Sequence, residues 1–510
     1  MQQSSLEQLR QEQELETKSK TRLRWVTDHL GLVVLLSTMA MYFATLNGIW
    51  ATDHSSAILD FQYSLWSDHS FIVGKVGSFT VNSVDLFQYK GNYFMANAPG
   101  VAFLTLPGAI AAFILNAGHF TVFGKALLFT EVPIAIANSF AAYFIFKIGN
   151  YYFQKDVSAF LALCYAFSTI SWPFATYLFQ SDVSALFDLL AAFLVIKIDR
   201  SNSLNSSSGK VGSFVFALIT GLAVTCGTFT DYVNGILVPI IGIYLFFALR
   251  KSRKKIIAKN LTGFLTGSLV VSSILFGLYN YLSFGRVFVS SEQLYLHSSS
   301  ILGNFTFPVD MGMILNLFTP MRGLFFFSPI LILGVWGLWK MMRDSTTDRE
   351  SFLFLSIFLG IIGLYSAWYA PDGGLSFGPR LIISSIPFLL IPAGFIISNA
   401  RGRFSYAFVY LLYAAGVCIN GSAAFTGALA PPTKSWLVSP FFSLTLPDLL
   451  AGKVDIWWKS SLGDFWVVVM AIVLGFALFF PMTCSYLSEK VYCLDPRGDG
   501  NNFRLTKLEQ

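Results

Sequence analysis

Aspartates at the ends of apolar runs are the residues of this sequence best placed for acid–base chemistry. Asp53 follows the first apolar run by about one helical turn, and Asp182 opens a later run in QSDVSALFDLL. A partly desolvated carboxylate gains basicity and can take a proton from a hydroxyl group. Asp53 is therefore a general base, a solvated loop acid or a helix N-cap. Asp182 is equally well explained as a helix cap.

Two arginines stand at the start of apolar runs later in the chain. Arg322 lies in FTPMRGLFFFSPI, and Arg380 lies in PDGGLSFGPRLII. A guanidinium group has a rigid fork of donors that fits phosphate oxygens, and Gly374 would let the backbone approach a ligand closely. The alternative is that both arginines reach toward lipid phosphates and bind no substrate.

The composition identifies the elements that must position these residues. The chain has 510 residues, of which 55% are hydrophobic and only 12% are charged, and its mean hydropathy is +0.61. Soluble domains carry about 25% charged residues, so soluble enzymes, disordered proteins and nucleic-acid binders are excluded. The net charge of +6 comes from short basic clusters between apolar runs, which indicates membrane topology and no nucleic-acid partner. The five cysteines show no metal-binding spacing.

The apolar runs predict about twelve membrane-spanning helices, each needing about 20 residues. The first 28 residues are polar and end in a basic cluster, which the positive-inside rule keeps in the cytoplasm. Counting all thirteen runs as spans would place the basic segment 250–259 outside. We therefore interpret the run 103–117, with Pro107 and Gly108, as a re-entrant or interfacial helix. The remaining runs are at about 29–50, 124–146, 157–179, 183–198, 212–230, 233–249, 260–282, 324–340, 351–369, 381–399, 404–427 and 464–482.

The predicted fold is an all-α polytopic membrane protein with both termini in the cytoplasm. The outer loops hold most of the unusual polar residues, and the aromatic segment with Tyr93, Asn97 and Pro99 suits either a lipid-facing groove or an interfacial aromatic belt. The predicted segments are a cytoplasmic N-terminal segment (1–28), a transmembrane module with the candidate catalytic residues (29–400) and its outer loop (51–100), C-terminal helices (401–487) with an outer loop (428–463), and a cytoplasmic tail (488–510).

Taken in order, these pieces resemble the GT-C superfamily of polytopic membrane glycosyltransferases. The similarity is to the branch that uses dolichyl- or polyprenyl-phosphate sugars, which includes protein O-mannosyltransferases and lipid A aminoarabinose transferases. It rests on the acid after the first span, Ser64-Leu65, the G-x-Y-F…P segment from Gly91 to Pro99, and Asp182. The most specific segments are MRGLFFFSP (321–329) and GGLSFGPR (373–380).

The resemblance implies an inverting transfer of a sugar from a polyprenyl (dolichyl) phosphate to an acceptor hydroxyl at the outer face of the membrane. The enzyme would be a hexosyl- or pentosyltransferase, and its acceptor a protein, a glycan or a lipid. The family's general base corresponds to Asp53, with Asp60 as a fallback, and Asp182 is a further catalytic candidate. The implied phosphate-binding residues are Arg380 and Arg322, with Lys75 and Lys90 as weaker candidates, and the donor or acceptor groove would contain Tyr93, Asn97, Pro99 and Gly374.

Several points stay open at this stage. His54 stands where relatives often have Glu, and Asn97-Ala98-Pro99 stands where they often have Lys-Pro-Pro. The sequence identifies no certain cofactor; a divalent metal ion is possible, and its ligands are unknown. A secondary transporter or a lipid-linked sugar flippase is the alternative function, and a non-catalytic assembly subunit is a third. A prokaryotic plasma membrane is favoured over the endoplasmic reticulum.

Overall fold

The structure is a computed structural model. It describes residues 28–47, 53–73, 85–115, 123–203, 209–297, 301–427, 429–431, 435–459, 467 and 469–480. The predicted site residue Lys75 lies outside these ranges. The side chain of Asp53 also lies outside the described part, although its backbone begins a helix.

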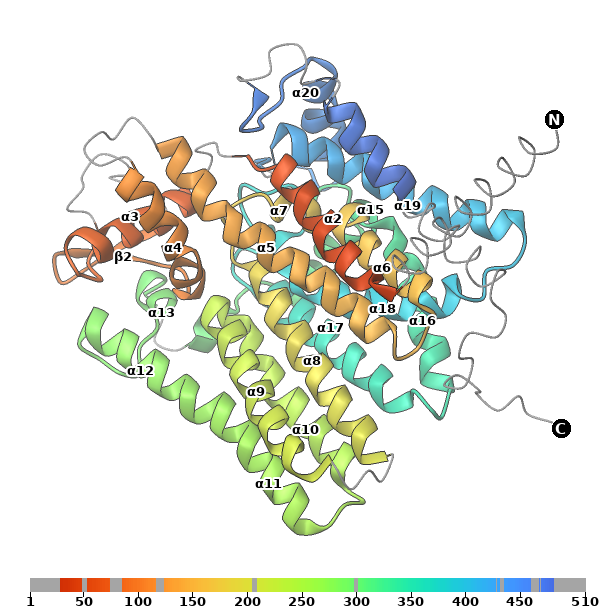
Figure 1. The fold of residues 1–510 in the computed structure, drawn as a ribbon. Helices are drawn as coiled ribbons and strands as arrows, with labels where there is room; N and C mark the ends of the chain where they lie inside the picture. The colour runs from red at the N-terminus through yellow and green to blue at the C-terminus, as the bar shows by residue number, and fades with distance from the viewer. Residues whose placement is uncertain are drawn as a thin grey trace, which may run out of the picture.

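The described chain is mostly helical, and Figure 1 shows the helices gathered into one bundle with a smaller group of elements at its side. The helices are α2 (Leu30–Ala44), α3 (Asp53–Ser67), α4 (Gly100–Leu115), α5 (Phe123–Gly149), α6 (Lys155–Ser168), α7 (Ser171–Phe174), α8 (Ser181–Ser203), α9 (Gly209–Thr230), α10 (Leu237–Leu249), α11 (Lys254–Leu265), α12 (Val271–Phe284), α13 (Ser291–Tyr295), α14 (Val309–Phe318), α15 (Leu324–Phe327), α16 (Ile332–Arg343), α17 (Asp348–Ala367), α18 (Ile386–Ile397), α19 (Arg403–Thr426) and α20 (Leu446–Leu450).

Short non-α turns link some of these helices. A π-helical turn (Thr266–Val270) joins α11 to α12, and 3-10 turns precede α10 (η2, Tyr232–Ile236) and α18 (η6, Arg380–Ser385). The other turns are η4 (Ile301–Asn304), η5 (Pro329–Leu331) and η7 (Phe441–Thr445).

Length and hydropathy make this a multi-pass integral membrane protein. In the described residues, seven helical segments are long and apolar enough to cross a membrane, and five shorter apolar helices include α2 and α4. The seven are Leu128–Gly149, Ser213–Thr230, Tyr232–Leu249, Lys254–Phe284, Asp348–Ala367, Arg380–Ile397 and Arg403–Thr426. The total of about twelve spans stays a prediction.

Two predicted spans are broken in the structure. The run 157–179 becomes α6, which ends at Ser168, and the four-residue α7; Thr169 between them is extended, with ψ 166°. The run 324–340 is interrupted between α15 and α16 at Pro329, which has no backbone N–H to continue a helix. The run 103–117 forms the 16-residue α4 with Pro107 inside it.

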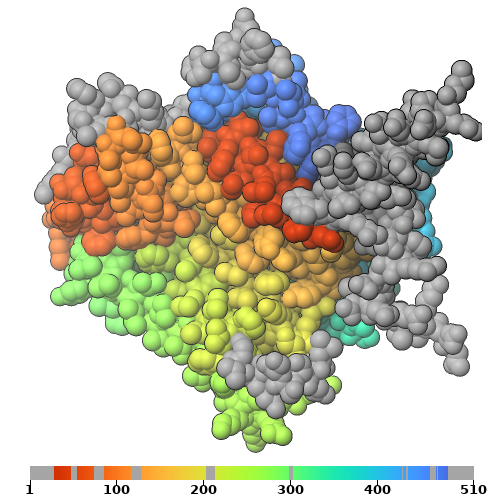
Figure 2. All heavy atoms as spheres, viewed as in Figure 1, coloured from red at the N-terminus to blue at the C-terminus, as the bar shows by residue number. Residues whose placement is uncertain are grey.

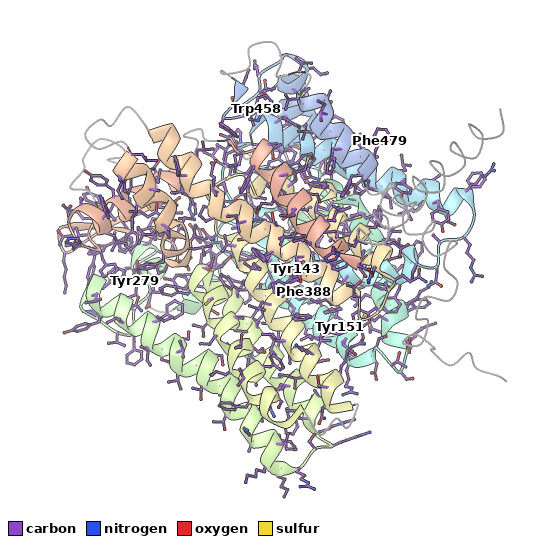
Figure 3. The ribbon with its side chains drawn as sticks, in the orientation of Figure 1. Tyr143, Tyr151, Tyr279, Phe388, Trp458 and Phe479 are labelled. Atoms are coloured by element: carbon purple, nitrogen blue, oxygen red, sulfur yellow. The ribbon has the colours of Figure 1, made fainter. Side chains whose placement is uncertain are left out.

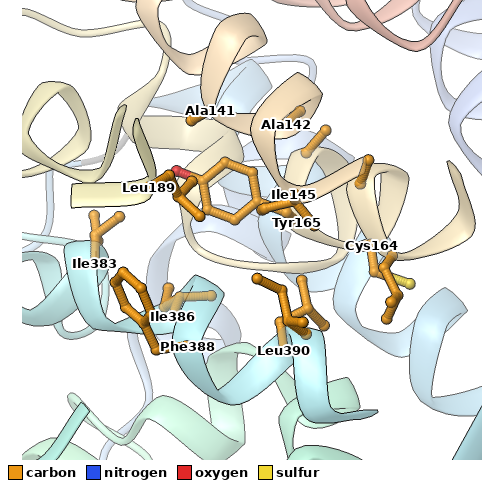
Figure 4. Close-up of a cluster of buried hydrophobic side chains, with 14 of the residues drawn as sticks. Ala141, Ala142, Ile145, Cys164, Tyr165, Leu189, Ile383, Ile386, Phe388 and Leu390 are labelled. Carbon is orange, nitrogen blue, oxygen red and sulfur yellow. The ribbon is translucent and has the colours of Figure 1, made fainter. Parts of the chain in front are cut away.

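Close packing of small side chains holds the bundle together. Figure 4 shows Ala141, Ala142 and Ile145 of α5 facing Leu189 of α8, Tyr165 of α6 and the apolar residues of η6 and α18. Helices α16 and α18 approach through Gly334 and Gly337, where any Cβ atom would collide with main-chain carbonyls of α18. A larger residue at either glycine would force these helices apart.

The group of elements at the side of the bundle contains the one departure from the all-α prediction. Strands β1 (Leu86–Tyr89) and β2 (Asn92–Met95) form an antiparallel hairpin, and the two turn residues have positive φ, 49° at Lys90 and 82° at Gly91. Both values suit the two-residue turns that match strand twist. The sequence prediction missed these strands because each is only four residues long.

A separate apolar core packs the hairpin between α3 and α12. Phe94 of the hairpin packs edge-on against Phe284 at 5.2 Å between ring centroids, and Phe61 of α3 packs against Tyr279 at 6.4 Å. Tyr279 lies on α12, near α13 (Figure 3). In the space-filling view the α3–α4 region and the α12–α13 region form one continuous surface (Figure 2). This packing brings strand β1 against α13.

Candidate active site

A cavity of about 390 Å³ lies where three segments distant in sequence meet. The region from α3 to Asn97, helix α13 and the segment from the end of α17 to η6 each contribute polar groups to its wall. The polar lining side chains are His54, Asp85 and Asn97 from the first segment, Glu292 and Tyr295 from the second, Tyr365, Tyr369 and Arg380 from the third, and Gln180 just before α8.

Three glycines shape the turn that places Arg380 at the wall of the cavity. Gly373, Gly374 and Gly378 have φ of 70°, 64° and 72°, a left-handed conformation that side chains rarely adopt. Gly378 also has no room for a Cβ atom, because Ile170 and Phe327 pack against it. Gly374 lines the cavity, and its close approach to a ligand stays a prediction.

Arg322 is fully buried behind this turn and does not line the cavity. Its Nε donates to the carbonyl of Asp372 at 2.8 Å, Nη2 donates to the carbonyls of Gly374 and Ala430 at 2.9 and 3.2 Å, and Nη1 donates to the carbonyl of Met321 at 3.1 Å. Burial lowers the pKa of Arg322 to about 10, and the negative charge of Asp372 opposes this shift. The group stays cationic at neutral pH and ties the glycine turn to the segment around residue 430.

Arg380 differs from Arg322 in having no such acceptors among the described residues. Its guanidinium lies 4.5 Å from the ring centroid of Phe179, and its buried Nε has no hydrogen-bond partner. Within the described ranges no carboxylate lies within 4 Å of this guanidinium, although it lines the cavity. A cation without an ion pair in a polar cavity is suited to receive an anion.

His54 and Asp85 form a hydrogen-bonded pair on the opposite part of the lining. The Nδ1 atom of His54 lies 3.3 Å from Oδ2 of Asp85 and 2.9 Å from the amide nitrogen of Asn97, and the imidazole stacks on Phe179 at 5.1 Å between centroids. Burial opposes ionisation of Asp85, but its hydrogen bond and charge contact with His54, the charge of Arg380 and the Asn97 amide together lower its pKa below the ordinary value. Asp85 is therefore a carboxylate at neutral pH.

Glu292 is the other acid of the cavity. It lies in the first turn of α13, which begins after Ser290; the Ser290 hydroxyl caps the helix by accepting from the Gln293 N–H at 3.1 Å. Burial and the negative charge of Asp231 raise the pKa of Glu292 to about 8. Near neutral pH this carboxyl is largely protonated and can donate a hydrogen bond.

The other predicted site residues are dispersed. Asn97 lines the cavity, whereas Pro99 is buried at the start of α4 and Tyr93 is exposed on the hairpin. Asp60 is buried within α3, and Asp182 is fully buried beside Ser171; neither lines the cavity. Lys90, at the hairpin turn, lies over the ring of Tyr89.

Sequence reasoning missed His54, Asp85 and Glu292 as members of the site. His54 was visible only as a departure from the resembled family, and Asp85 and Glu292 stand in unremarkable loop sequences. Among the described residues no group of three or more His, Cys, Asp or Glu could hold a metal ion. The possible divalent metal stays a prediction, because the Asp53 side chain lies outside the described part.

No protein-family model and no curated protein matches the sequence. Solved structures do match. The apo oligosaccharyltransferase of Archaeoglobus fulgidus is 11% identical with a TM-score of 0.51, over 80% of this chain and 57% of that one. The same archaeon's AglB, in complex with an inhibitory peptide and a dolichol-phosphate, is 13% identical with a TM-score of 0.50, over 81% and 57%. ArnT from Cupriavidus metallidurans, bound to undecaprenyl phosphate, is 14% identical with a TM-score of 0.49, over 90% and 77%.

These likenesses concern the fold. The oligosaccharyltransferase and ArnT, a lipid A aminoarabinose transferase, are both GT-C glycosyltransferases. The two archaeal structures confirm the fold that the motif resemblance implies. The chain spans just over half the length of the oligosaccharyltransferase that it matches.

Proposed function

We propose that the protein is an inverting glycosyltransferase that moves a sugar from a polyprenyl-phosphate donor to an acceptor hydroxyl at the outer face of the membrane. The observation that carries this proposal is Arg380, a cation without an ion pair in the described residues, on the wall of a polar cavity. The leaving group of such a donor is a lipid phosphate, and its negative charge grows as the bond to the sugar breaks. A fixed guanidinium stabilises that charge best in the transition state.

The fold supports the proposal without identifying the reaction. Structures with a similar arrangement of helices include one with dolichol-phosphate, although identity is only 13%. The multi-pass helices of this chain provide the apolar surroundings that a polyprenyl tail requires. The cavity would lie at the outer face and both termini in the cytoplasm of a prokaryotic cell.

The roles of the remaining residues follow from their positions. Arg380 binds the donor phosphate, and Arg322 holds the glycine turn that presents Arg380, since the four acceptors of Arg322 are main-chain carbonyls. The acceptor's proton is taken in the first turn of α3, where the resemblance assigns Asp53. The sugar and the acceptor occupy the cavity beside Asn97 and Gly374.

The test uses purified protein in nanodiscs with a panel of radiolabelled polyprenyl-phosphate sugars. We expect the wild type to consume one donor, and Arg380→Ala to weaken undecaprenyl phosphate binding by about 10- to 100-fold, the value of one to two charge-assisted hydrogen bonds. Arg286→Ala is the matched control, because Arg286 is exposed and does not line the cavity. Unchanged affinity in Arg380→Ala would refute the phosphate site, and transmembrane sugar flux without donor consumption would favour a transporter.

A further inference from the structure

We propose that a second cavity, at the end of α12, binds the phosphate group of a membrane phospholipid. This α12 cavity has a volume of about 460 Å³ and shares no lining residue with the candidate active site. Its wall comes from the residues that follow α3, from the β1–β2 hairpin and from the end of α12. The binding goes beyond the proposed function, because it does not depend on sugar transfer.

Donor groups without acidic neighbours line the α12 cavity. His69, Lys90 and Asn92 are exposed and contribute an imidazole, an ammonium group and an amide. None of the described lining residues is acidic, and Asp68, next to His69 in the chain, does not line the cavity. In the part of the chain that the structure describes, neither His69 nor Lys90 has an ion-pair partner within 4 Å. Such a lining favours an anion with several acceptor oxygens, as in a phosphate group.

The backbone at two of these residues favours glycine or asparagine. The φ angle is 52° at His69 and 49° at Lys90, both in the left-handed region. His69 lies just after α3, where the N–H of Ser70 bonds to the carbonyl of Ser64 at 3.2 Å, and a helix that ends in this way usually has glycine there. Lys90 occupies the first turn position of the hairpin, which is usually Asn, Asp or Gly. Since the local fold does not favour histidine or lysine at these positions, we attribute their side chains to binding.

The length of α12 and the helix before it indicates that the anion belongs to a lipid head group. Helix α11, the π-helical turn and α12 form one apolar segment of 31 residues, Lys254–Phe284, which is about 46 Å long at 1.5 Å per residue. A bilayer with its head groups is about 40–45 Å thick. The segment starts in the basic segment 250–259, which the positive-inside rule keeps in the cytoplasm. Its other end therefore reaches the level of the opposite head groups.

The surface beside the α12 cavity can hold acyl chains. Only 22% of the most apolar window of Lys254–Phe284 is buried. Near the cavity, Leu278, Tyr281 and Leu282 are 55%, 60% and 52% exposed, and Leu282 also lines the cavity. A phospholipid can therefore place its phosphate beside Lys90 while its chains lie along α12.

The three segments of the wall are joined to one another. The N–H of Val73 donates to the carbonyl of Tyr93 at 2.8 Å, which ties the residues after α3 to the hairpin. Tyr89 and Phe94 pack against Phe284 at 6.1 and 5.2 Å between ring centroids, which ties the hairpin to the end of α12. The cavity is thus built into the fold, so an anion can bind with little further ordering.

The α12 cavity and the candidate active site hold different cations. The resemblance makes Lys90 a weaker candidate for the donor phosphate, but Lys90 does not line the cavity that contains Arg380. Arg380 in turn does not line the α12 cavity. Substitutions at the two residues can therefore separate the two phosphate sites.

The experiment measures the Tm of delipidated protein in detergent, with and without phosphatidylglycerol, an anionic phospholipid. Without lipid, the Tm of Lys90→Asn and of His69→Gly should equal or exceed that of the wild type, because both new residues suit a left-handed backbone. With lipid, the Tm of the wild type should rise by about 2 °C or more and exceed that of both variants. Titration should give an affinity about 3- to 10-fold weaker in each variant, the value of one exposed charge-assisted hydrogen bond.

Three further variants serve as controls. His297→Gly is the matched control, because His297 is exposed with φ 51° and lines neither cavity; it should keep the wild-type response to lipid. Lys90→Gln removes the charge without introducing a favoured turn residue, and it should lose the response as Lys90→Asn does. Arg380→Ala should keep the response. A response lost in Arg380→Ala and kept in the His69 and Lys90 variants would place the lipid in the active-site cavity and overturn the inference.

Two other ligands test the lipid assignment. Diolein has the acyl chains without a phosphate, and inorganic phosphate has no chains; we expect each alone to raise the Tm of the wild type less than phosphatidylglycerol does. A rise with inorganic phosphate that equals the rise with lipid would mean that the site takes a free anion. Equal lipid responses in the wild type and the His69 and Lys90 variants would overturn the site itself. None of these measurements requires donor turnover, so their failure leaves the proposed function untouched.

Discussion

Helices α8 and α17 each run from the cavity to a cluster of ion pairs, and the charged side chains at the two ends differ in their partners. In this ion-pair cluster, Arg349 lies 2.9 Å from Asp199 and Arg200 lies 3.4 Å from Glu350. The hydroxyl of Tyr244 also donates to Asp199 at 3.0 Å. The buried carboxylates at this end, Asp199 and Glu350, therefore have cationic partners within the chain, although Nε of Arg200 is buried without a hydrogen bond.

At the cavity end of the same helices, Arg380 has no carboxylate within 4 Å among the described residues. Nε of Arg380 and Nε2 of His54 are both buried without a hydrogen bond in the described residues. The ion pairs separate the two ends: Arg200 and Arg349 each have a carboxylate within 3.4 Å, whereas a buried cation without such a partner costs free energy unless an anion binds beside it. The comparison indicates that the ion-pair cluster serves stability, whereas the cavity end is completed by a ligand.

Arg322 gives the largest expected effect and the strictest test of the comparison, because it lies beside the cavity but is fully bonded. Arg322→Met would leave four main-chain carbonyl contacts unmade at a buried position. We expect a loss of at least about 3 kcal/mol in the free energy of unfolding, measured by thermal unfolding in detergent. The free energy of unfolding of Arg322→Lys should lie between those of the wild type and Arg322→Met, because lysine keeps the charge but loses the planar fork.

The opposite result for Arg322 would break the comparison. If Arg322→Met folds as stably as the wild type and loses undecaprenyl phosphate affinity, then Arg322 is a phosphate ligand, as the sequence first suggested. Its main-chain contacts would then be replaceable.

A matched pair of substitutions sharpens the comparison between the two ends. Arg349→Met should lower the free energy of unfolding by about 1–3 kcal/mol, because buried Asp199 loses an ion pair, and should leave kcat unchanged. Arg380→Met should leave stability unchanged or raised and reduce turnover. Thermal unfolding and donor consumption are measured on both variants. Equal changes in stability and in turnover would show that the two ends do not differ in function.

The sequence was sufficient for the membrane class and the GT-C resemblance, because both depend on composition and on local motifs. It placed long helices such as α9 and α19 within a few residues, since each is one continuous apolar run. It did not locate the break after Ser168 or the short β1–β2 hairpin. These depend on local turns and on the apolar core between α3 and α12, not on hydropathy.

For the site, the sequence identified Arg380, Asn97 and Gly374, all of which line the cavity. It could not separate Arg322 from Arg380, because both have the same flanking pattern and differ only in contacts up to 108 residues away. His54, Asp85 and Glu292 become neighbours only when three distant segments pack together. A single sequence carries no direct signal for that proximity.

Glu292 provides the smallest expected effect, a pH dependence confined to the cavity end. Its pKa is raised from 4.5 to about 8, by burial first and by the charge of Asp231 second. The folded state therefore binds more protons than the unfolded state between these values, so the stability contributed by the neutral carboxyl falls as pH rises from about 4.5 to about 8. Glu292→Gln keeps a neutral side chain at every pH and should remove this part of the slope. The Tm difference from the wild type should be about 2 °C or more at pH 8 and close to zero at pH 4.5.

Asp310→Asn, at an exposed position of α14, controls for the loss of one carboxylate. A Tm difference that is constant with pH would mean that Glu292 is ionised in the folded protein, and the cavity end would then hold two charged acids, Asp85 and Glu292, with Arg380.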